Sequence, residues 1–498
     1  MCNSSSGRFS VSKSEKWNFA GRLVRRLGQN SHLIDAATGE TLGGRDIAES
    51  IVGFAVGFSS VGLQAGDRLL VSCGHDPAST LAYLGAVYGG LVPVLMEDRA
   101  LPRLGESMLA KANAKAVWTA TGLRGAWGGK NDVLQLEGNF SARAAQLLEP
   151  APCEEDDLAA LMPTSGSTGL PRLVMVSHRN LLANTEAIVR SQHLGIDESA
   201  MLIMPVSYCF GASVMHSHLY QGGGVVFDSR FMFPDKVLHA INTYACTTFA
   251  GVPTVYNILL SRSHLRAFPL PGLRRFLQAG GALAPERIRQ MRDIVPTAEF
   301  LVMYGQTEAT ARISCLPPDR LGEKLGSAGL PLDNLVIRIV DEMGREVPTG
   351  QTGEIQVCGP SVCSGYLDDA EATQRKFNGG WLKTGDFGCR DDEGYLWIKG
   401  RTGEFIKIRG VRVSFAEVEA KLAAIPGVYQ CVATAVPHPE AGEALALFVV
   451  ADTGVHNIIE RVRRALPPPW TCASVNVVAE LPETANGKIA RFQLQIMQ

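Results

Sequence analysis

The sequence predicts an α/β protein: a large N-terminal domain of mostly parallel sheets with flanking helices and a small β-rich subdomain, then a small α+β C-terminal domain. Residues 17–330 alternate short apolar runs with helical stretches, the pattern of parallel strands joined by helices. Residues 331–400 contain short alternating strands between Gly-rich turns, which favours antiparallel sheet. Beyond Gly400 the composition changes again, so we expect domains at 1–400 and 401–498.

Composition and charge restrict the class of protein. The chain has 498 residues, of which 46% are apolar and 19% charged, and these values describe a globular protein larger than one ordinary domain. Its 47 basic and 49 acidic residues leave a formal net charge of −2, so no nucleic-acid partner is expected. The eleven cysteines contain no C-x-x-C pair, which favours free thiols in a reducing compartment. We therefore expect a cytoplasmic protein.

One stretch of twenty uncharged residues, Pro77–Met96, raises the question of a membrane helix. Pro93 and a Gly-Gly pair interrupt it, and its length only just suffices to span a bilayer. We interpret it instead as a buried helix over Ala78–Tyr88 followed by a strand over Val92–Met96. No integral membrane association is expected.

The other elements follow from apolar runs and the residues that interrupt them. In the N-terminal domain we expect strands at 68–72, 116–119, 158–162, 173–176 and 299–303 and a helix at 104–112. The β-rich subdomain has expected strands at 336–340, 353–357 and 394–398. The C-terminal domain has an expected helix at 417–425 and strands at 432–436 and 445–451.

A loop of hydroxyls and glycines, Thr164–Gly169, lies between two of these strands. Gly166 and Gly169 can take positive φ and let the backbone approach a ligand. Successive N–H groups in such a turn form an anion site, and the hydroxyls add donors. No Gly-x-x-x-x-Gly-Lys-Ser/Thr pattern fits the loop. Taken alone it is equally well a solvated connector, so its meaning depends on the motifs that follow.

A second motif, Met303-Tyr-Gly-Gln-Thr-Glu308, follows an expected strand. Polar residues at the carboxyl end of a strand lie where ligands bind in α/β sheets. An aromatic ring can cover a base, the hydroxyl of Thr307 can bond a phosphate oxygen, and the carboxylate of Glu308 can hold Mg²⁺. The alternative is a polar loop with a surface glutamate.

Two shorter motifs are weaker by themselves. Asp386, in Thr-Gly-Asp after an expected tight turn, can accept both hydroxyls of a ribose, although the same tripeptide is also a plain Asx-type turn. The Gly280-Gly281-Ala282 segment leaves room for a flat base against the backbone, although it is also a plain tight turn.

In this order the motifs resemble those of the AMP-forming adenylating enzymes, which include acyl- and aryl-CoA synthetases, peptide-synthetase adenylation domains and luciferases. The resemblance covers essentially the whole chain from about residue 30 onward. Two positions depart from the usual pattern, because Arg172 replaces a common Lys and Leu173 a frequent Gly. The positive charge is kept, so phosphate geometry is loosened at most.

The resemblance implies roles for the nucleotide-binding residues. Glu308 is expected to hold magnesium, Thr307 to contact the α-phosphate, and Asp386 to bind the ribose with Arg401 as its partner. The remaining ATP- or AMP-binding positions are Thr164, Ser165, Gly166, Ser167, Thr168, Gly169, Arg172, Gly281, Ala282, Tyr304 and Gly305.

The resemblance also implies a mobile C-terminal domain. Lys488 stands where the family keeps its adenylation lysine. Gly403 occupies the hinge, where Asp or Lys is usual, and glycine absorbs large φ/ψ changes easily. The loop expected to serve the thioester step contains Lys407, Gly410 and Arg412. A basic β-hairpin would explain these charges without explaining the order of the motifs.

The acid pocket indicates the kind of substrate. Amino-acid-activating members keep an Asp for the substrate's α-ammonium, and this chain has Cys209 at that position. A buried ammonium without a carboxylate is costly, so an α-amino acid is disfavoured and an uncharged acyl or aryl tail is expected. The resemblance implies these pocket-lining candidates: Tyr208, Cys209, Phe210, Phe249, Gly251, Ala279, Gly281, Met303, Ala309 and Ile313.

The expected reaction forms acyl-AMP from ATP·Mg²⁺ and a carboxylate, and then transfers the acyl group to a thiol. CoA is the preferred thiol because nothing in this chain is attached to a carrier domain. A phosphopantetheinyl carrier protein acting in trans is the alternative. A protein of another class, a non-catalytic relative that binds nucleotide or acid, is also kept, although every expected polar group is present.

Overall fold

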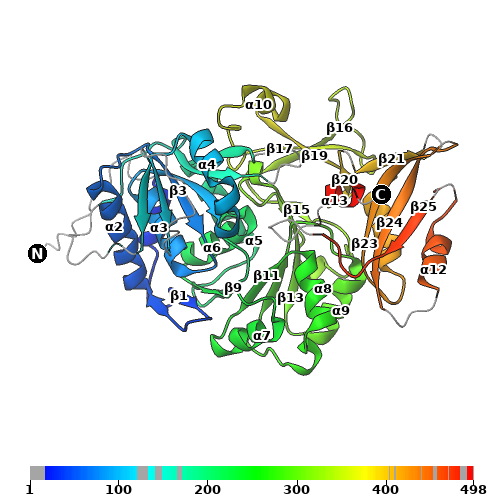
Figure 1. Cartoon of the computed structure of the whole chain (residues 1–498), viewed down its shortest axis with the longest axis horizontal. Coiled ribbons are helices and arrows are strands. Elements are labelled where there is room, and N and C mark those ends of the chain that lie inside the picture. Colours follow the sequence, from blue (N-terminus) through cyan, green and yellow to red (C-terminus); the bar gives the residue numbers. More distant parts are fainter. Residues whose placement is uncertain are drawn as a thin grey trace, which may run out of the picture.

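The structure is a computed structural model (Figure 1). It describes residues 17–120, 133–138, 140, 149–164, 171–402, 404–408, 411–438, 440–452, 457–468, 470, 472–482, 489 and 491–496.

The first sheet has six strands in the order β6-β5-β3-β4-β7-β8. All neighbouring pairs are parallel except β7 with β8, which are antiparallel. The strands are β3 (Arg68–Cys73), β4 (Val92–Glu97), β5 (Ala116–Thr119), β6 (Leu134–Glu137), β7 (Leu158–Pro163) and β8 (Leu173–Ser177). Because β7 and β8 are consecutive antiparallel strands, the segment between them is a hairpin connection.

The second sheet has nine strands in the order β15-β14-β13-β12-β11-β9-β10-β1-β2, parallel from β13 to β1 with antiparallel edges. Its strands are β1 (His32–Asp35), β2 (Thr41–Gly43), β9 (Ser199–Leu202), β10 (Gly224–Phe227), β11 (Thr248–Gly251), β12 (Arg275–Gln278), β13 (Glu299–Tyr304), β14 (Ser314–Cys315) and β15 (Leu330–Pro331). The carboxyl ends of the parallel strands therefore share one edge.

A layer of helices lies between the two sheets: α3 contacts strands of both, α5 contacts β7 and β8, and α6 contacts β9 and β10. All twelve residues of α6 are buried, as expected for a helix that is covered on every side. Helices α7 to α9 cover the outer face of the nine-stranded sheet and α4 that of the other. The helices are α1 (Phe19–Val24), α2 (Gly44–Ser60), α3 (Pro77–Tyr88), α4 (Leu101–Ala112), α5 (His178–Ser191), α6 (Cys209–Tyr220), α7 (Pro234–Thr243), α8 (Pro253–Arg262) and α9 (Pro285–Ile294).

The β-rich part forms a third sheet, in which β16, β17, β19 and β18 are neighbours and β20 pairs with β19. Its elements are β16 (Val336–Val340), β17 (Gly353–Cys358), α10 (Ala370–Lys376), β18 (Phe377–Asn378), β19 (Trp381–Arg390) and β20 (Leu396–Arg401). All its pairs are antiparallel, and this confirms the β-rich subdomain predicted for residues 331–400.

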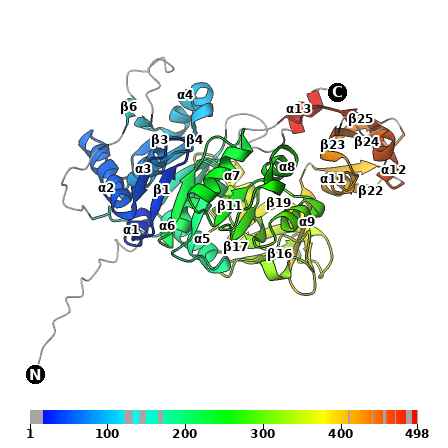
Figure 2. The ribbon, with the colours of Figure 1, turned by 90° about the horizontal axis from the view of Figure 1, so that it is seen from below.

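The C-terminal part has its own sheet, with β22, β21, β24 and β23 as neighbours and β25 beside β24. Its elements are β21 (Phe405–Ile408), β22 (Val411–Ser414), α11 (Phe415–Ala423), β23 (Val428–His438), β24 (Gly442–Ala451), α12 (Ile458–Ala465), β25 (Cys472–Val477) and α13 (Arg491–Ile496). The apolar cores of this part contain only residues from Ile406 onward. Figure 2 shows it at one end of the molecule, beside α8 and α9, and the guanidinium of Arg287 in α9 donates to the Val428 carbonyl over 2.9 Å.

The α/β class is confirmed, and the differences concern the ends of elements. The 104–112 helix begins at Leu101, the 417–425 helix spans Phe415–Ala423, and the 394–398 strand begins at Leu396. The 432–436 strand extends over Val428–His438 because β24 pairs along its whole length. Tertiary pairing sets such ends, and local pattern does not. Among the described residues no helix is long and apolar enough to cross a membrane.

Candidate active site

The chain after β13 turns sharply at the carboxyl edge of the nine-stranded sheet. A Cβ on Gly305 would overlap the carbonyl of Ala311, so only glycine fits between the two backbones. Thr310 and Ala311 follow with φ of +54° and +89°, a left-handed conformation that costs free energy in residues with a side chain. The turn directs the short helix Thr307–Ala309 toward the β-rich sheet, where the Glu308 carbonyl accepts from the Cys363 amide over 2.9 Å.

Asp386 lies in contact with this turn. Its Oδ2 accepts a 2.6 Å hydrogen bond from the Tyr304 hydroxyl, and its Oδ1 lies 3.6 Å from Nε of Arg401. The side chain of Asp386 is 10% exposed, so the carboxylate is largely buried. The expected partnership between Asp386 and Arg401 is thus present as a contact.

The prediction of a tight turn before Asp386 was wrong. Asp386 lies inside the ten-residue strand β19 and is paired with Arg401 of β20. Gly385 has φ +76°. Lys383 is paired with Gln356 of β17 and Phe387 with Glu354, so β19 has extra residues around Gly385 between these two pairs. The left-handed glycine therefore forms a bulge, because strand pairing continues past it. The bulge serves the same end as a turn, since it aims the carboxylate at Tyr304.

Glu308 is buried and has a partner that the sequence did not suggest. Its Oε1 accepts a 2.6 Å hydrogen bond from the Tyr366 hydroxyl. Burial, reinforced by this carboxylate, raises the pKa of Tyr366, so the phenol remains a donor. The Arg172 guanidinium lies over the same ring, 5.6 Å from its centroid, and its Nε donates to Asp369 over 3.0 Å. Tyr366 therefore contacts both Arg172, just after the predicted phosphate-binding loop, and the carboxylate of Glu308.

Lys376 is a second residue that sequence reasoning missed. Its Nζ donates to the Thr384 carbonyl over 2.7 Å, one residue before the Gly385 bulge. Burial lowers the pKa of Lys376, and the nearby carboxylates of Glu308 and Asp386 oppose that shift. A lysine at a helix end has no distinctive signal in sequence, and only the folded chain brings it near the carboxylates of Glu308 and Asp386.

The turn at Gly280–Ala282, predicted to lie against a flat base, is beside these groups, since β12 and β13 are parallel neighbours. Gly280 has φ +86°, and the Gln278 side chain holds the turn by donating to the Gly281 carbonyl over 2.7 Å. Gly281 and Ala282 are exposed. A flat surface of backbone next to Tyr304 is therefore open to a ligand.

Most of the phosphate loop lies outside the described residues: Ser165, Gly166, Ser167, Thr168 and Gly169. Its two ends are described, and the Thr164 amide donates to the Arg172 carbonyl over 2.9 Å. Beyond the loop, β8 bonds to the chain around Tyr366, as Leu367 N donates to Leu173 O over 2.8 Å. The loop thus starts and ends next to the Tyr366–Glu308 pair.

The acid-pocket candidates divide into two groups. Tyr208, Cys209 and Phe210 begin α6, and the Thr307 hydroxyl donates to Cys209 Sγ over 3.4 Å. Met303 faces the same helix layer, because its thioether accepts from the Gln192 side chain, which follows α5, over 3.4 Å. Ala279 follows the last residue of β12 and lies beside Met303 of the neighbouring strand β13. Ala309 and Ile313 belong to the turn after β13 and are fully buried.

Phe249 and Gly251 are not brought to that group. Phe249 is paired with Phe276 and lies 6.2 Å from the rings of Phe276 and Tyr256. Strand pleating places these rings on the outer face under α8, opposite to Met303. A Cβ on Gly251 would approach Val255 of the same helix. Phe249 therefore lies on the opposite face of the sheet from Met303, with which it was predicted to line the pocket.

Arg312 is the residue of the pocket that the sequence did not indicate. It is 2% exposed, and Asn184 fixes its backbone by donating to the Arg312 carbonyl over 2.8 Å. The guanidinium contacts the Met303 thioether, the Ser213 hydroxyl at 3.4 Å and the face of Phe210, whose centroid lies 5.2 Å away. Arg312 lies four residues after the Met303–Glu308 motif. The sequence feature that could have revealed it is a basic residue between two predicted pocket positions, Ala309 and Ile313.

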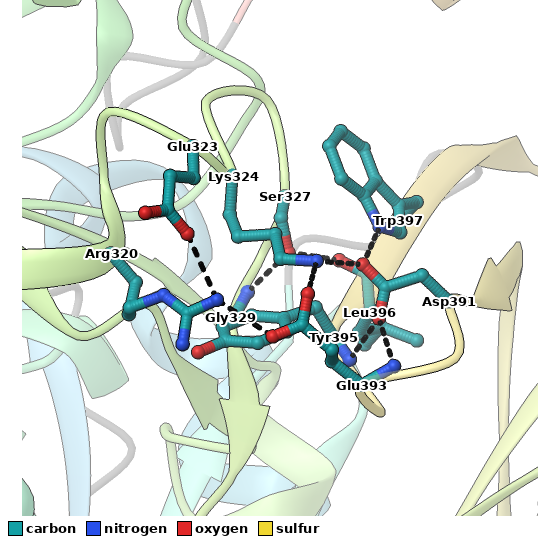
Figure 3. A network of polar contacts seen from close by, with 10 residues as sticks. All are labelled: Arg320, Glu323, Lys324, Ser327, Gly329, Asp391, Glu393, Tyr395, Leu396 and Trp397. Atoms are coloured by element: carbon teal, nitrogen blue, oxygen red, sulfur yellow. Dashed lines mark hydrogen bonds and ion pairs between the residues drawn. The ribbon is translucent and has the colours of Figure 1, made fainter.

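A surface network fixes the β-rich hairpin that carries Asp386 and Arg401 (Figure 3). Lys324 lies 2.9 Å from Asp391 and 2.5 Å from Glu393, and Arg320 lies 2.6 Å from Glu393. Asp391 and Glu393 belong to the turn between β19 and β20. Backbone bonds accompany the ion pairs, since Ala328 N donates to Leu396 O over 2.7 Å. The network attaches this hairpin to the loop that follows β14.

In the C-terminal part, β21 and β22 form a hairpin in which Lys407 is paired with Arg412. Gly403, Gly410 and Lys488 lie outside the described residues, as do the side chains of Lys407 and Arg412. Arg491 follows the lysine and is described. It forms a two-pronged pair with Glu419, at 2.6 and 3.0 Å, and donates to Ala433 O over 2.8 Å. The pair with Glu419 joins α13 to α11, and the bond to Ala433 joins it to the C-terminal sheet.

Polar groups gathered at the carboxyl ends of β12 and β13 define a ligand-binding α/β protein. The chain belongs to the AMP-binding enzyme family: the model of the AMP-binding enzymes matches residues 22–367 and that of their C-terminal domain matches residues 417–488. The resemblance inferred from the motifs is confirmed.

Individual relatives agree with this assignment to the AMP-binding enzyme family. A feruloyl-CoA synthase of Amycolatopsis sp is 30% identical over 486 residues, 95% of this chain and 97% of that protein. A 2-succinylbenzoate–CoA ligase of Bacillus licheniformis is 33% identical over 345 residues, 68% of this chain and 70% of that protein. ATP-bound MatB from Rhodopseudomonas palustris superposes with a TM-score of 0.88 at 27% identity, covering 97% of this chain and 98% of that chain.

Proposed function

We propose that the chain is an AMP-forming acid–thiol ligase that activates a carboxylic acid as acyl-AMP and transfers the acyl group to CoA. The observation that carries the proposal is the joining of Tyr304, Glu308, Asp386 and Arg401 at one sheet edge in a member of this family. Relatives named as CoA ligases support CoA as the acceptor. Cytoplasmic location agrees with the ten free cysteines among the described residues.

The first half of the reaction depends on positioning and charge, because transfer at phosphorus asks for little covalent chemistry by the protein. Asp386 would accept the ribose hydroxyls with Arg401 beside it. The exposed Gly281–Ala282 backbone and Tyr304 would border adenine, and Thr307 would bond the α-phosphate. Lys488 would bridge the carboxylate and the α-phosphate, while Thr164–Gly169 and Arg172 would hold the outer phosphates.

Magnesium fits the donor set that is described. The buried Glu308 offers one carboxylate, and Mg²⁺ is ordinarily held by one or two carboxylates together with substrate phosphates. When bound, the ion would neutralise charge on the triphosphate. Tyr366 orients the carboxylate through its hydroxyl.

For the second half, rotation about Gly403 would withdraw Lys488 and present the loop with Lys407, Gly410 and Arg412 to the adenylate. The thiol then attacks the acyl carbonyl and AMP leaves. We divide the chain for this purpose into residues 1–400 and a mobile unit of residues 401–498, in keeping with the separate apolar cores.

The test is ATP–pyrophosphate exchange with a panel of acids, followed by thioester formation with either CoA or a phosphopantetheinyl carrier protein. Exchange with at least one acid and thioester formed on CoA are expected. Thioester formed on the carrier protein alone would make the chain a carrier-loading adenylation enzyme. No exchange with any acid, although nucleotide binds, would make it a non-catalytic relative.

A further inference from the structure

We infer that the acid activated by this chain carries a second anionic group, a carboxylate or sulfonate, at the end of its tail, and that Arg312 binds it. The inference rests on the proposed function and concerns the same acid pocket. It departs from the uncharged tail expected from the sequence.

The first argument is the surroundings of the guanidinium. Among the described residues its polar partners are the Met303 thioether and the Ser213 hydroxyl, with the Phe210 ring against it. No carboxylate of the described chain forms an ion pair with it, although Arg275, almost as buried, is paired with Glu198 at 3.0 Å. A buried charge without a counter-ion costs folding free energy. A bound ligand with an anionic group would therefore stabilise the buried guanidinium.

The titratable groups that face Arg312 are two thiols and a phenol, and none of them is a carboxylate. They are Cys315, Cys209 and Tyr208. Burial raises the pKa of the Cys315 thiol to about 11 and also raises that of the Tyr208 phenol, so both are neutral at pH 7. Burial lowers the pKa of Arg312 itself to about 10, which leaves the guanidinium protonated.

The position of Arg312 makes a substrate tail the natural partner. Cys209 accepts from the Thr307 hydroxyl, which is placed at the α-phosphate in the proposed reaction. Ser213 lies one turn further along α6, on the side of Arg312. An acid whose reacting carboxylate lies at Thr307 therefore extends its tail past Cys209 toward the guanidinium. The same charge repels an α-ammonium, in agreement with the absence of an aspartate at Cys209.

The space beside Cys209 and Ser213 is confined, and both polar and apolar side chains line it. A cavity of about 10 Å³ shares Cys209 and Ser213 with this group and is also lined by His216. That volume holds about one water molecule. Nε2 of His216 is buried without a partner in the described part of the chain, and burial lowers its pKa to about 3, so the ring is neutral and adds no competing charge.

The test compares acids in matched pairs by ATP–pyrophosphate exchange. Succinate, glutarate and terephthalate are each measured against their monomethyl esters, which keep the shape and remove the second charge, and 3-sulfopropionate is measured against butyrate. The wild-type enzyme is expected to favour the anionic member of at least one pair by about 100-fold in kcat/KM, since truncating one side of a buried charge pair has effects of this order. The pair that responds distinguishes a carboxylate from a sulfonate.

The variant Arg312→Met keeps the stem and removes the charge, and it should bring the ratio of that pair to about one while neutral acids are activated as well or better. Arg266→Met, at an exposed arginine far along the chain from the site, should leave the ratio unchanged. Near-UV circular dichroism checks that the variants fold. If Arg312→Met does not fold, the wild-type ratio still decides whether the anionic acid is preferred.

Wild-type enzyme that activates only the neutral members, or an unchanged ratio in a folded Arg312→Met, overturns this inference and leaves the proposed function intact. Wild-type enzyme that exchanges with no acid of either kind overturns the proposed function as well.

Discussion

Replacing Asp386 by asparagine tests the nucleotide site most directly. Asparagine has the same shape, can still accept from the Tyr304 hydroxyl, and loses the charge that faces Arg401 at 3.6 Å. Two ribose hydroxyls would lose a carboxylate acceptor. A hydrogen bond to a charged group contributes about 1.5–3 kcal/mol, and part of it survives with the amide, so KM for ATP should rise by roughly 10- to 100-fold.

The effect on folding should be much smaller. The Arg401 side chain is half exposed, and exposed ion pairs contribute about 0–1 kcal/mol. Initial rates of exchange at varied ATP, together with thermal unfolding, separate the two effects. Asp341→Asn, which alters an exposed Asp341–Arg345 pair in a surface turn, is the matched control and should leave KM for ATP unchanged. An unaltered KM in Asp386→Asn would refute the reasoning that this carboxylate binds ribose.

Three further substitutions test the remaining parts of the site. Lys488→Ala should abolish exchange while sparing thioester formation from supplied acyl-AMP, and equal loss of both steps would argue against separate roles. Lys376→Met should raise KM for ATP without lowering the melting temperature, because it removes a partly buried ammonium near two carboxylates; normal ATP kinetics would make the lysine structural. Arg491→Met should destabilise the C-terminal part by roughly 3 kcal/mol, because Glu419 is left largely buried and unpaired, and amide hydrogen exchange that stays as slow as in the wild type over β23 and α13 would contradict this.

The sequence by itself determined the fold class and brought together part of the candidate site. Alternating apolar runs require buried parallel strands, and polar residues directly after a strand must lie at its carboxyl edge wherever that strand is placed. This is why Tyr304, Thr307 and Glu308 were found from one motif. The order of the motifs along the chain then indicated the family, which the comparisons confirm.

Only the tertiary structure decided which distant residues meet. Tyr366 and Lys376 reach Glu308 and the Asp386 strand through loops and a helix end that have no periodic pattern. Phe249 left the predicted pocket because strand pleating, unlike strand order, depends on register. In the sequence Arg312 is one charge among apolar neighbours, and its role becomes apparent only because it is buried and no carboxylate of the described residues pairs with it. Burial and pairing are properties of the whole packed chain, so no local window of sequence contains them.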